Sequence, residues 1–177
     1  MSICKNALPA ILIILMPFMA FGGENVKAKK VFTILLEDAS GKEAWLPYIG
    51  EYPLLVIYED FRRIGDNRGL YERIRKDTEI SGKIRIVHIL NMVPVWHTPD
   101  FLITHSLKKT GEIYPGVTSL LDRGRGLQKK WRLLDSNEKS VLIIIKSNSE
   151  IEGIWYDAPD KNSIKKIEDK LRVMAED

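Results

Sequence analysis

Short apolar runs separated by polar turns predict a sheet with interleaved helices. Residues 54–61 (LLVIYEDF) and 84–90 (IRIVHIL) are nearly continuous in apolar character, which is typical of strands buried on both faces. Between them, Leu70 and Ile74 mark the inner face of a helix over about 67–78, whose outer face is charged. This strand-helix-strand unit predicts a right-handed crossover between two parallel strands.

An N-terminal hairpin and a second helix flank this unit in the predicted fold. Residues 31–36 and 43–46 are expected to pair as short strands, because the stretch EDASGK between them is rich in turn formers. Pro99 suits the first turn of the second helix, for which Thr98 is the expected N-cap and Gly111 the expected end.

The last third of the chain predicts strands followed by a terminal helix. Apolar residues recur at helical spacing from 160 to 174, and this stripe is expected to pack on the core. Trp45, Trp131 and Trp155 are interpreted as core or strand residues. We interpret residues 31–177 as a single domain, since no repeat or linker interrupts them. The predicted strands, of which the last two form a hairpin, are residues 117–121, 127–134, 141–146 and 151–156.

The first 22 residues have the pattern of a secretory signal peptide. A lone lysine precedes an apolar run over residues 7–21, and small residues stand at the two positions that a signal peptidase requires. The run is shorter than the roughly 20 apolar residues that span a bilayer, and two prolines interrupt it. We therefore favour cleavage after Gly22 over a retained membrane anchor. Residues 23–30 are then a short disordered leader, and the mature protein is expected to be periplasmic and free of the membrane.

Charge balance and cysteine content narrow the function classes. Without Lys5 the mature chain has 26 Lys+Arg (27 less one) against 24 Asp+Glu, a net charge of +2, so nucleic acid is not an expected partner. Cys4 is the only cysteine of the chain, and it leaves with the predicted signal peptide. Disulfide exchange and cysteine-based peroxidase chemistry require a thiolate, so neither is expected.

The order of the predicted elements resembles the thioredoxin-like fold, an α/β fold with a mixed central sheet and helices on both faces. Here it carries an N-terminal hairpin as an extension. Within that superfamily the chain is most similar to the exported YtfJ-like family. The resemblance covers most of residues 50–175 in order and spacing, and it implies a fold and an exported location but no activity. The stretches that carry it are IVHILN, YPGVTSLLD, LQKKWRLLD and SVLIIIKSNSEIEGIW.

The chain departs from the redox members of that superfamily at both halves of their active site. Redox members carry a C-x-x-C in the loop after the first buried strand, where a helix N-terminus lowers the pKa of a thiol. Here the loop reads RRIGDN, over residues 62–67. Redox members also carry a cis-proline just before the terminal hairpin, whereas residues 135–139 (DSNEK) contain no proline.

The loop over residues 62–67 and the helix start behind it form one candidate binding site. A helix N-terminus presents free N–H groups and a partial positive charge, which together with nearby arginines suit a carboxylate or phosphate. The alternative is a solvated turn in which Glu59, Asp60 and Asp66 pair with the arginines and Asp66 or Asn67 caps the helix. We prefer this alternative, because exposed ion pairs are common and nearly neutral in energy. The candidate ligand-binding residues here are Arg62, Arg63, Asn67 and Arg68.

The loop after the second buried strand supplies two further candidates. It is expected at the same sheet edge, where ligands bind in open parallel sheets. Trp96 is suited to stacking on a ligand, and His97 is suited to proton transfer near neutral pH. Equally, Trp96 covers the end of the sheet and His97 lies in solvent.

No catalytic or metal-binding constellation stands out. His97 and His105 are about two helical turns apart, too far for one zinc ion if both lie on the helix. No G-x-S-x-G elbow occurs, and the turn around Gly124 lacks the spacing of a phosphate-binding loop. We therefore expect no cofactor, no metal and no catalytic residue. The preferred function is a non-enzymatic exported domain that binds a protein or peptide. The alternative is a small-anion receptor or non-redox enzyme that uses Arg62, Arg63 and His97.

Overall fold

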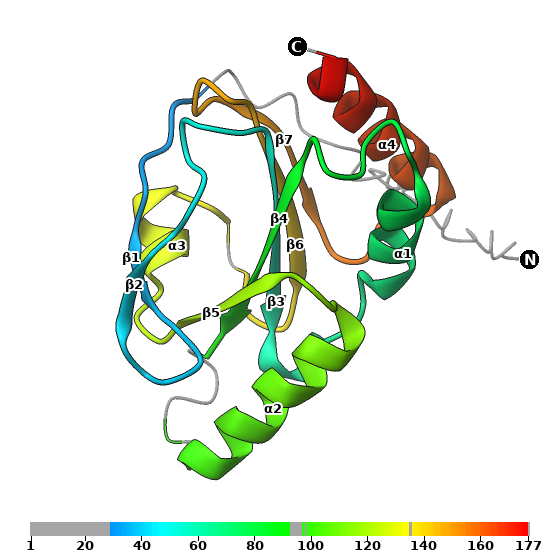
Figure 1. The fold of residues 1–177 in the computed structure, drawn as a ribbon. Helices are drawn as coiled ribbons and strands as arrows, with labels where there is room; N and C mark the ends of the chain where they lie inside the picture. The colour runs from blue at the N-terminus through cyan, green and yellow to red at the C-terminus, as the bar shows by residue number, and fades with distance from the viewer. Residues whose placement is uncertain (1–28, 93–96, 98, 135, 177) are drawn as a thin grey trace, which may run out of the picture.

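A mixed sheet forms the centre of the computed structural model (Figure 1), which describes residues 29–92, 97, 99–134 and 136–176. Within these residues the sheet has seven strands in the order β2-β1-β5-β4-β3-β6-β7. The predicted thioredoxin-like fold with an N-terminal hairpin is confirmed. The strands are β1 (Leu35–Glu37), β2 (Glu43–Trp45), β3 (Leu54–Asp60), β4 (Arg85–Asn91), β5 (Thr118–Asp122), β6 (Ser140–Ile145) and β7 (Ile151–Tyr156).

The central strands are parallel and share one carboxyl edge. β3 pairs with β4 in parallel from Leu54 opposite Arg85 to Asp60 opposite Asn91, and β4 pairs in parallel with β5. The outer pairs are antiparallel: β6 with β3, β7 with β6, and β1 with both β2 and β5. All seven residues of β3 are buried, as its apolar run predicts, because the sheet is covered on both faces there.

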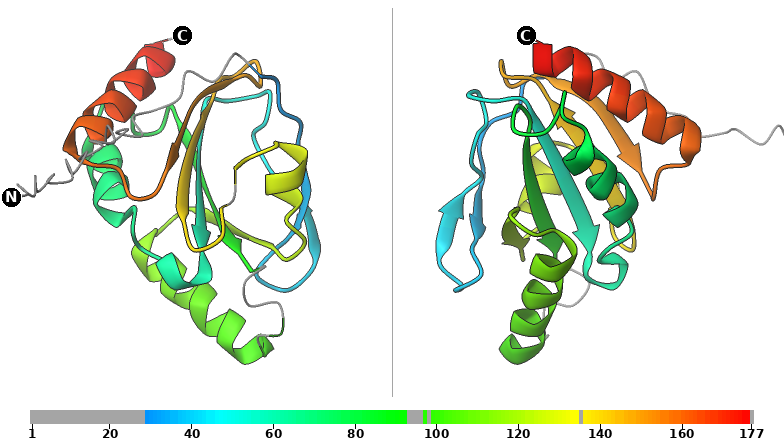
Figure 2. Two further views of the ribbon diagram at one scale, coloured as in Figure 1. Left: turned by 180° about the vertical axis from the view of Figure 1, so that it is seen from behind. Right: turned by 45° about the vertical axis from the view of Figure 1, so that its right-hand side comes forward.

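Helices cover both faces of the sheet (Figure 2). Apolar residues of α1 and α4 meet the sheet on one face, and Ile103 and Leu107 of α2 pack near its carboxyl edge on Leu90 and Leu121. The opposite face is covered by Leu127 and Trp131 of the α3 region together with the N-terminal segment. The helices are η1 (Phe61–Arg63, a 3-10 turn), α1 (Arg68–Lys76), α2 (Asp100–Ile113), α3 (Gly126–Lys130) and α4 (Lys161–Glu176).

Two element predictions are wrong in an instructive way. Residues 127–134 do not form a strand, because Leu127 and Trp131 are spaced one helical turn apart and are buried together by α3 and the turn after it. Helix α2 does not end at Gly111 but continues to Ile113 and is followed by Tyr114, whose N–H bonds to the Thr110 carbonyl. Thr98, the predicted N-cap of this helix, lies outside the described residues.

The N-terminal end of the described chain is tied to the β6–β7 hairpin. Lys30 forms an isolated antiparallel bridge with Glu150, and the Ile151 N–H donates to the Lys29 carbonyl at 3.0 Å. The last two residues of the predicted leader are therefore part of the structure. The predicted signal peptide, residues 1–22, lies outside the described residues. Among the residues that are described, no helix has the length and apolar character that a membrane crossing requires.

A glycine in β7 provides a test of the packing. Gly153 pairs with Ile144, and a Cβ added to it would overlap the ring of Trp155 on the same strand. Gly153→Ala is therefore expected to lower the free energy of unfolding by about 1–3 kcal/mol, because the ring must move within a packed face. Urea denaturation followed by circular dichroism measures this change.

Gly111 is the matched control for this substitution. It lies in α2 with no atom within 4 Å of an added Cβ. Gly111→Ala is expected to raise the free energy of unfolding by about 0.5–1 kcal/mol, because alanine is the better helix former. Equal effects of the two substitutions would contradict the packing of Trp155 over Gly153.

Candidate functional site

Arg62 lies at the carboxyl edge of the sheet and is held by two acids. Its Nε is 3.3 Å from Asp60 Oδ1, and its Nη1 is 3.0 Å from Glu138 Oε1. Asp60 ends β3, whereas Glu138 belongs to the turn before β6, so Arg62 links two segments that are far apart in the sequence. The side chain of Arg62 is half exposed, with a relative accessibility of 51%.

Arg63 of the loop and Arg68 at the start of α1 also have acidic partners of their own. Arg63 Nε is 2.5 Å from Asp66 Oδ2, and Arg68 Nε is 2.7 Å from Glu72 Oε1 one turn along α1. This pairing corresponds to the alternative in which the loop is a solvated turn, with Asp60 and Asp66 as the partners. Ligand binding by Arg62, Arg63 and Arg68 stays a prediction, now for guanidinium groups that each contact a carboxylate.

Glu59 does not pair with the arginines. Its side chain is fully buried, and its carboxylate lies at the start of α1. Oε2 accepts a hydrogen bond from Gly65 N–H (3.1 Å), and Oε1 accepts from both the N–H (3.2 Å) and the side-chain amide (3.0 Å) of Asn67. A carboxylate of the chain itself therefore occupies the position in which a helix N-terminus attracts an anion.

A histidine and a tyrosine complete this buried network. His88 Nε2 lies 3.1 Å from Glu59 Oε2, and the Tyr114 hydroxyl donates to Glu59 Oε1 at 2.8 Å. The rings of His88 and Tyr114 stack with centroids 5.1 Å apart, and Tyr71 meets Tyr114 edge to face. All three of Glu59, His88 and Tyr114 are fully buried, so β3, β4 and the end of α2 are joined through one carboxylate.

The environment of Glu59 keeps it ionised. Burial by itself raises the pKa of this carboxyl, but hydrogen bonds from His88, Gly65 and Tyr114 outweigh burial and hold the pKa below the ordinary glutamate value. The pKa of Tyr114 is raised, first by burial and then by the charge of Glu59, so its hydroxyl stays protonated and donates. We name Glu59, Asn67, His88 and Tyr114 the Glu59 network.

The turn before β6 closes over the same edge. Asp60 Oδ2 accepts from Glu138 N–H (2.8 Å), and Asp60 N–H donates to the Lys139 carbonyl (3.0 Å). This turn is the place where redox members of the superfamily carry the cis-proline. The residues that the structure describes contain no cis peptide bond. In this protein the end of β3 and the turn before β6 are joined by the two hydrogen bonds of Asp60 and by the ion pairs of Arg62.

The remaining sequence candidates lie in different settings. Asn67 stands at the N-cap position of α1, but its side chain does not cap the helix, because it turns inward to Glu59 and to Ser140 Oγ. His97 is exposed, and Trp96 lies outside the described residues, so its predicted stacking role stays a prediction. Among the described residues no group of three or more His, Cys, Asp or Glu side chains could hold a metal ion.

Sequence reasoning missed the Glu59 network because its members lie in different elements. One signal was present: Glu59 and His88 are ionisable residues inside apolar runs that otherwise predict strands buried on both faces. Buried charges in proteins are paired, so each of them called for a partner. Parallel pairing sets Ile57 opposite His88 and Glu59 opposite Leu90, so the two side chains come from positions two residues apart in register. Tyr114, which follows α2, had no comparable signal.

Solved structures confirm the thioredoxin-like fold of this chain. A structure described as thiol:disulfide interchange protein DsbE from Chlorobium tepidum aligns with a TM-score of 0.61 at 11% identity, covering 85% of this chain and 98% of that one. BsSco, a member of the Sco family of cytochrome c oxidase assembly proteins, aligns with a TM-score of 0.60 at 12% identity, covering 84% and 95%. A thiol-disulfide oxidoreductase from Bacteroides fragilis gives 0.56 at 13%, covering 80% and 99%.

These similarities define a fold. No family model and no curated protein matches the sequence. This chain therefore has a thioredoxin-like fold related to that of thiol-disulfide oxidoreductases, and its sequence holds a single cysteine, Cys4.

The Glu59 network predicts a large loss of stability when its charge is removed. Glu59→Gln is expected to lower the free energy of unfolding at pH 7 by about 2–4 kcal/mol, because a buried hydrogen-bonded carboxylate is lost while its donors stay buried. Chemical denaturation measures the change. Glu72→Gln, which removes an exposed carboxylate paired with Arg68, is the control and is expected to change stability by less than about 0.5 kcal/mol.

The lowered pKa of Glu59 predicts how the effect of Glu59→Gln on stability depends on pH. The folded-state pKa of Glu59 lies below its ordinary value of 4.5, so its stabilising contribution is present above that pH and is lost as the pH falls through the folded pKa. The stability difference between wild type and Glu59→Gln should therefore shrink on acidification. A difference that is constant from about pH 6 to pH 3 would contradict an ionised Glu59.

Proposed function

We propose that this chain is an exported, redox-inactive protein of the YtfJ-like group that binds a protein or peptide partner without catalysis. One observation carries the proposal. Redox members of the superfamily present a thiol at the start of this helix. Here the backbone N–H groups of Gly65 and Asn67, just before α1, donate hydrogen bonds to the carboxylate of Glu59. A carboxylate cannot exchange disulfides, and this one is buried.

The same contacts weigh against the alternative of a small-anion receptor or non-redox enzyme. An anion at the start of α1 would have to displace Glu59, and an anion at Arg62 or Arg63 would compete with carboxylates already in contact. His97, the third residue of this alternative, is exposed to solvent. The geometry therefore favours a binding protein over an enzyme at this edge.

The proposed contact surface lies where η1 and α2 meet. Phe61 and Ile64 pack inward beside Ile103 and Leu107, which fixes the loop against the helix. The opposite side of α2 exposes Phe101, with a relative accessibility of 69%. An exposed aromatic residue on a fixed helix is the kind of side chain that anchors protein interfaces. We name the exposed first turn of α2 together with the 61–67 loop the edge surface.

Export is part of the proposal and rests on the sequence. The first 22 residues have the signal-peptide pattern, and cleavage there removes Cys4. A protein without a thiol in an oxidising compartment depends on its core and not on disulfides for stability. Its partner would then be another exported protein or peptide.

The contact surface is tested by site-specific photo-crosslinking in the producing cell. A photoreactive amino acid in place of Phe101 is expected to give a discrete adduct in the exported fraction. The matched control places the same group at Val173, an exposed apolar position on α4 with a relative accessibility of 62%. An adduct of equal yield at both positions, or none at Phe101, would count against the edge surface.

A redox assay on the same purified protein tests the other half of the proposal. The mature protein is expected to show no catalysis of insulin reduction by dithiothreitol above the buffer rate, because it has no thiolate to form a mixed disulfide. Turnover in this assay, or Cys4 found in the exported protein by mass spectrometry, would overturn the redox-inactive assignment.

A further inference from the structure

A pocket lies at the opposite edge of the sheet, away from the Glu59 network. It has a volume of about 240 Å³ and is formed where β4 and β5 begin. Arg85 and Thr118, the first residues of these strands, line it together with Arg75 from the end of α1 and Tyr48 from the segment before β3. Ile74 and Ile80 are buried and supply apolar lining. We name this cavity the Arg85 pocket.

The Arg85 pocket differs from the carboxyl edge of the sheet in the charge of its side chains. Among the described residues that line it there are two arginines and no aspartate or glutamate. Within the described part of the chain, neither Arg75 nor Arg85 forms an ion pair, whereas Arg62, Arg63 and Arg68 each contact a carboxylate. Among the described residues, no acidic side chain is therefore paired with the two arginines of this pocket.

Arg85 is held in a defined position. Its guanidinium carbon lies 4.7 Å from the ring centroid of Tyr52 and 5.7 Å from that of Tyr48, and the two rings meet edge to face. Its backbone N–H bonds to the Pro53 carbonyl at 2.9 Å, and its Nε is buried with no acceptor among the described residues. Cation–π contacts fix a guanidinium without neutralising it, so Arg85 keeps its full charge for a ligand.

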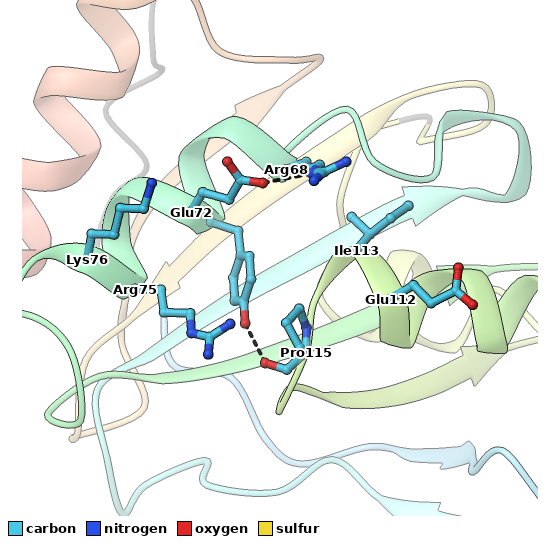
Figure 3. A pocket seen from close by; sticks show the side chains of 8 residues that line it. Arg68, Glu72, Arg75, Lys76, Glu112, Ile113 and Pro115 are labelled. Atoms are coloured by element: carbon cyan, nitrogen blue, oxygen red, sulfur yellow. Dashed lines mark hydrogen bonds and ion pairs between the residues drawn. The ribbon is translucent and has the colours of Figure 1, made fainter.

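A neighbouring pocket differs from the Arg85 pocket because acidic side chains also line it. It has a volume of about 290 Å³ and shares Tyr71, Arg75 and Pro115 with the Arg85 pocket. Figure 3 shows that Glu72 and Glu112 line it and that Arg68 is engaged with Glu72. Its charges are mixed, so an anion gains less there than in the Arg85 pocket.

The geometry points to the Arg85 pocket as a binding site for a small organic oxyanion. The ligand carries a carboxylate or phosphate group, which Arg75 and Arg85 bind, and an apolar or aromatic part, which packs on Tyr48 and the buried isoleucines. Arginine suits both kinds of oxyanion because its planar fork donates two parallel hydrogen bonds. Pockets that combine an apolar lining with a few convergent charged groups are typical of small-molecule sites. This inference is independent of the proposed partner-binding edge surface.

Isothermal titration calorimetry of the purified protein with three aromatic probes tests the inference. Phenyl phosphate and benzoate carry the two candidate oxyanions, and phenol is the neutral control. At least one of the two anions is expected to bind saturably at millimolar concentration or below, and phenol is expected not to bind. The anion that binds more tightly shows whether the pocket prefers a phosphate or a carboxylate. Failure of both anions to bind would overturn the site.

Variants then locate the binding. Arg85→Gln and Arg75→Gln are each expected to weaken the better probe by about ten-fold or more, because each removes a charged hydrogen-bond donor. Arg68→Gln, which alters the neighbouring pocket only, is expected to leave the affinity within about two-fold. Unchanged affinity in both Arg75→Gln and Arg85→Gln would overturn the inference.

A measurement on the unaltered chain guards against variants that fail to fold. Gly82 and Gly116 line the pocket. Their amide NMR signals should shift on addition of the probe that binds more tightly. The amide signal of Gly65, in the loop before α1, should not shift. Shifts confined to Gly65 would place the anion at the edge surface and overturn the Arg85 pocket as its site.

Discussion

One buried carboxylate organises the carboxyl edge of this sheet. Glu59 accepts hydrogen bonds from the start of α1 and from Tyr114, and it contacts His88 of β4. Since Glu59 cannot be solvated, each of these groups must hold its position for the charge to be tolerated. The loop over 61–67, the direction of α1 and the end of α2 are thus set by a single acid at the end of β3.

This arrangement places a structural carboxylate at the start of a helix in a thioredoxin-like fold. A helix N-terminus behind a parallel strand is favourable for a thiolate, because its N–H groups and dipole stabilise negative charge. Here the same groups stabilise the Glu59 carboxylate, and the turn before β6 is bonded to Asp60 instead of presenting a proline. The negative charge at this helix start therefore has a structural role.

The sequence was informative where a pattern is local and periodic. The apolar runs of β3 and β4 and the helical stripe of α4 were predicted from spacing alone, because burial of one face dictates each pattern. Residues 127–134 were misread because the two buried positions, Leu127 and Trp131, fit a helical turn as well as a strand, and the run is short.

The candidate site was harder to predict, since long-range contacts define it. The arginines of the loop are conspicuous in the sequence, but nothing local says that Arg62 meets Glu138, which is far along the chain. In the same way Arg85 reads as an ordinary strand residue until Tyr48 and Tyr52 are folded against it. Charge can be counted from the sequence, whereas its compensation by a partner is a property of the tertiary structure.

The two edge strands of the sheet, β2 and β7, offer little free backbone for pairing with other molecules. β2 is only three residues long, and at the start of β7 the segment around Lys30 pairs with Glu150 and Ile151. Long, flat and unpaired borders recruit strands from neighbouring molecules, and short or covered ones resist such recruitment. The N-terminal hairpin thus takes the edge position that β5 would otherwise have, so the parallel strands β3, β4 and β5 all lie inside the sheet.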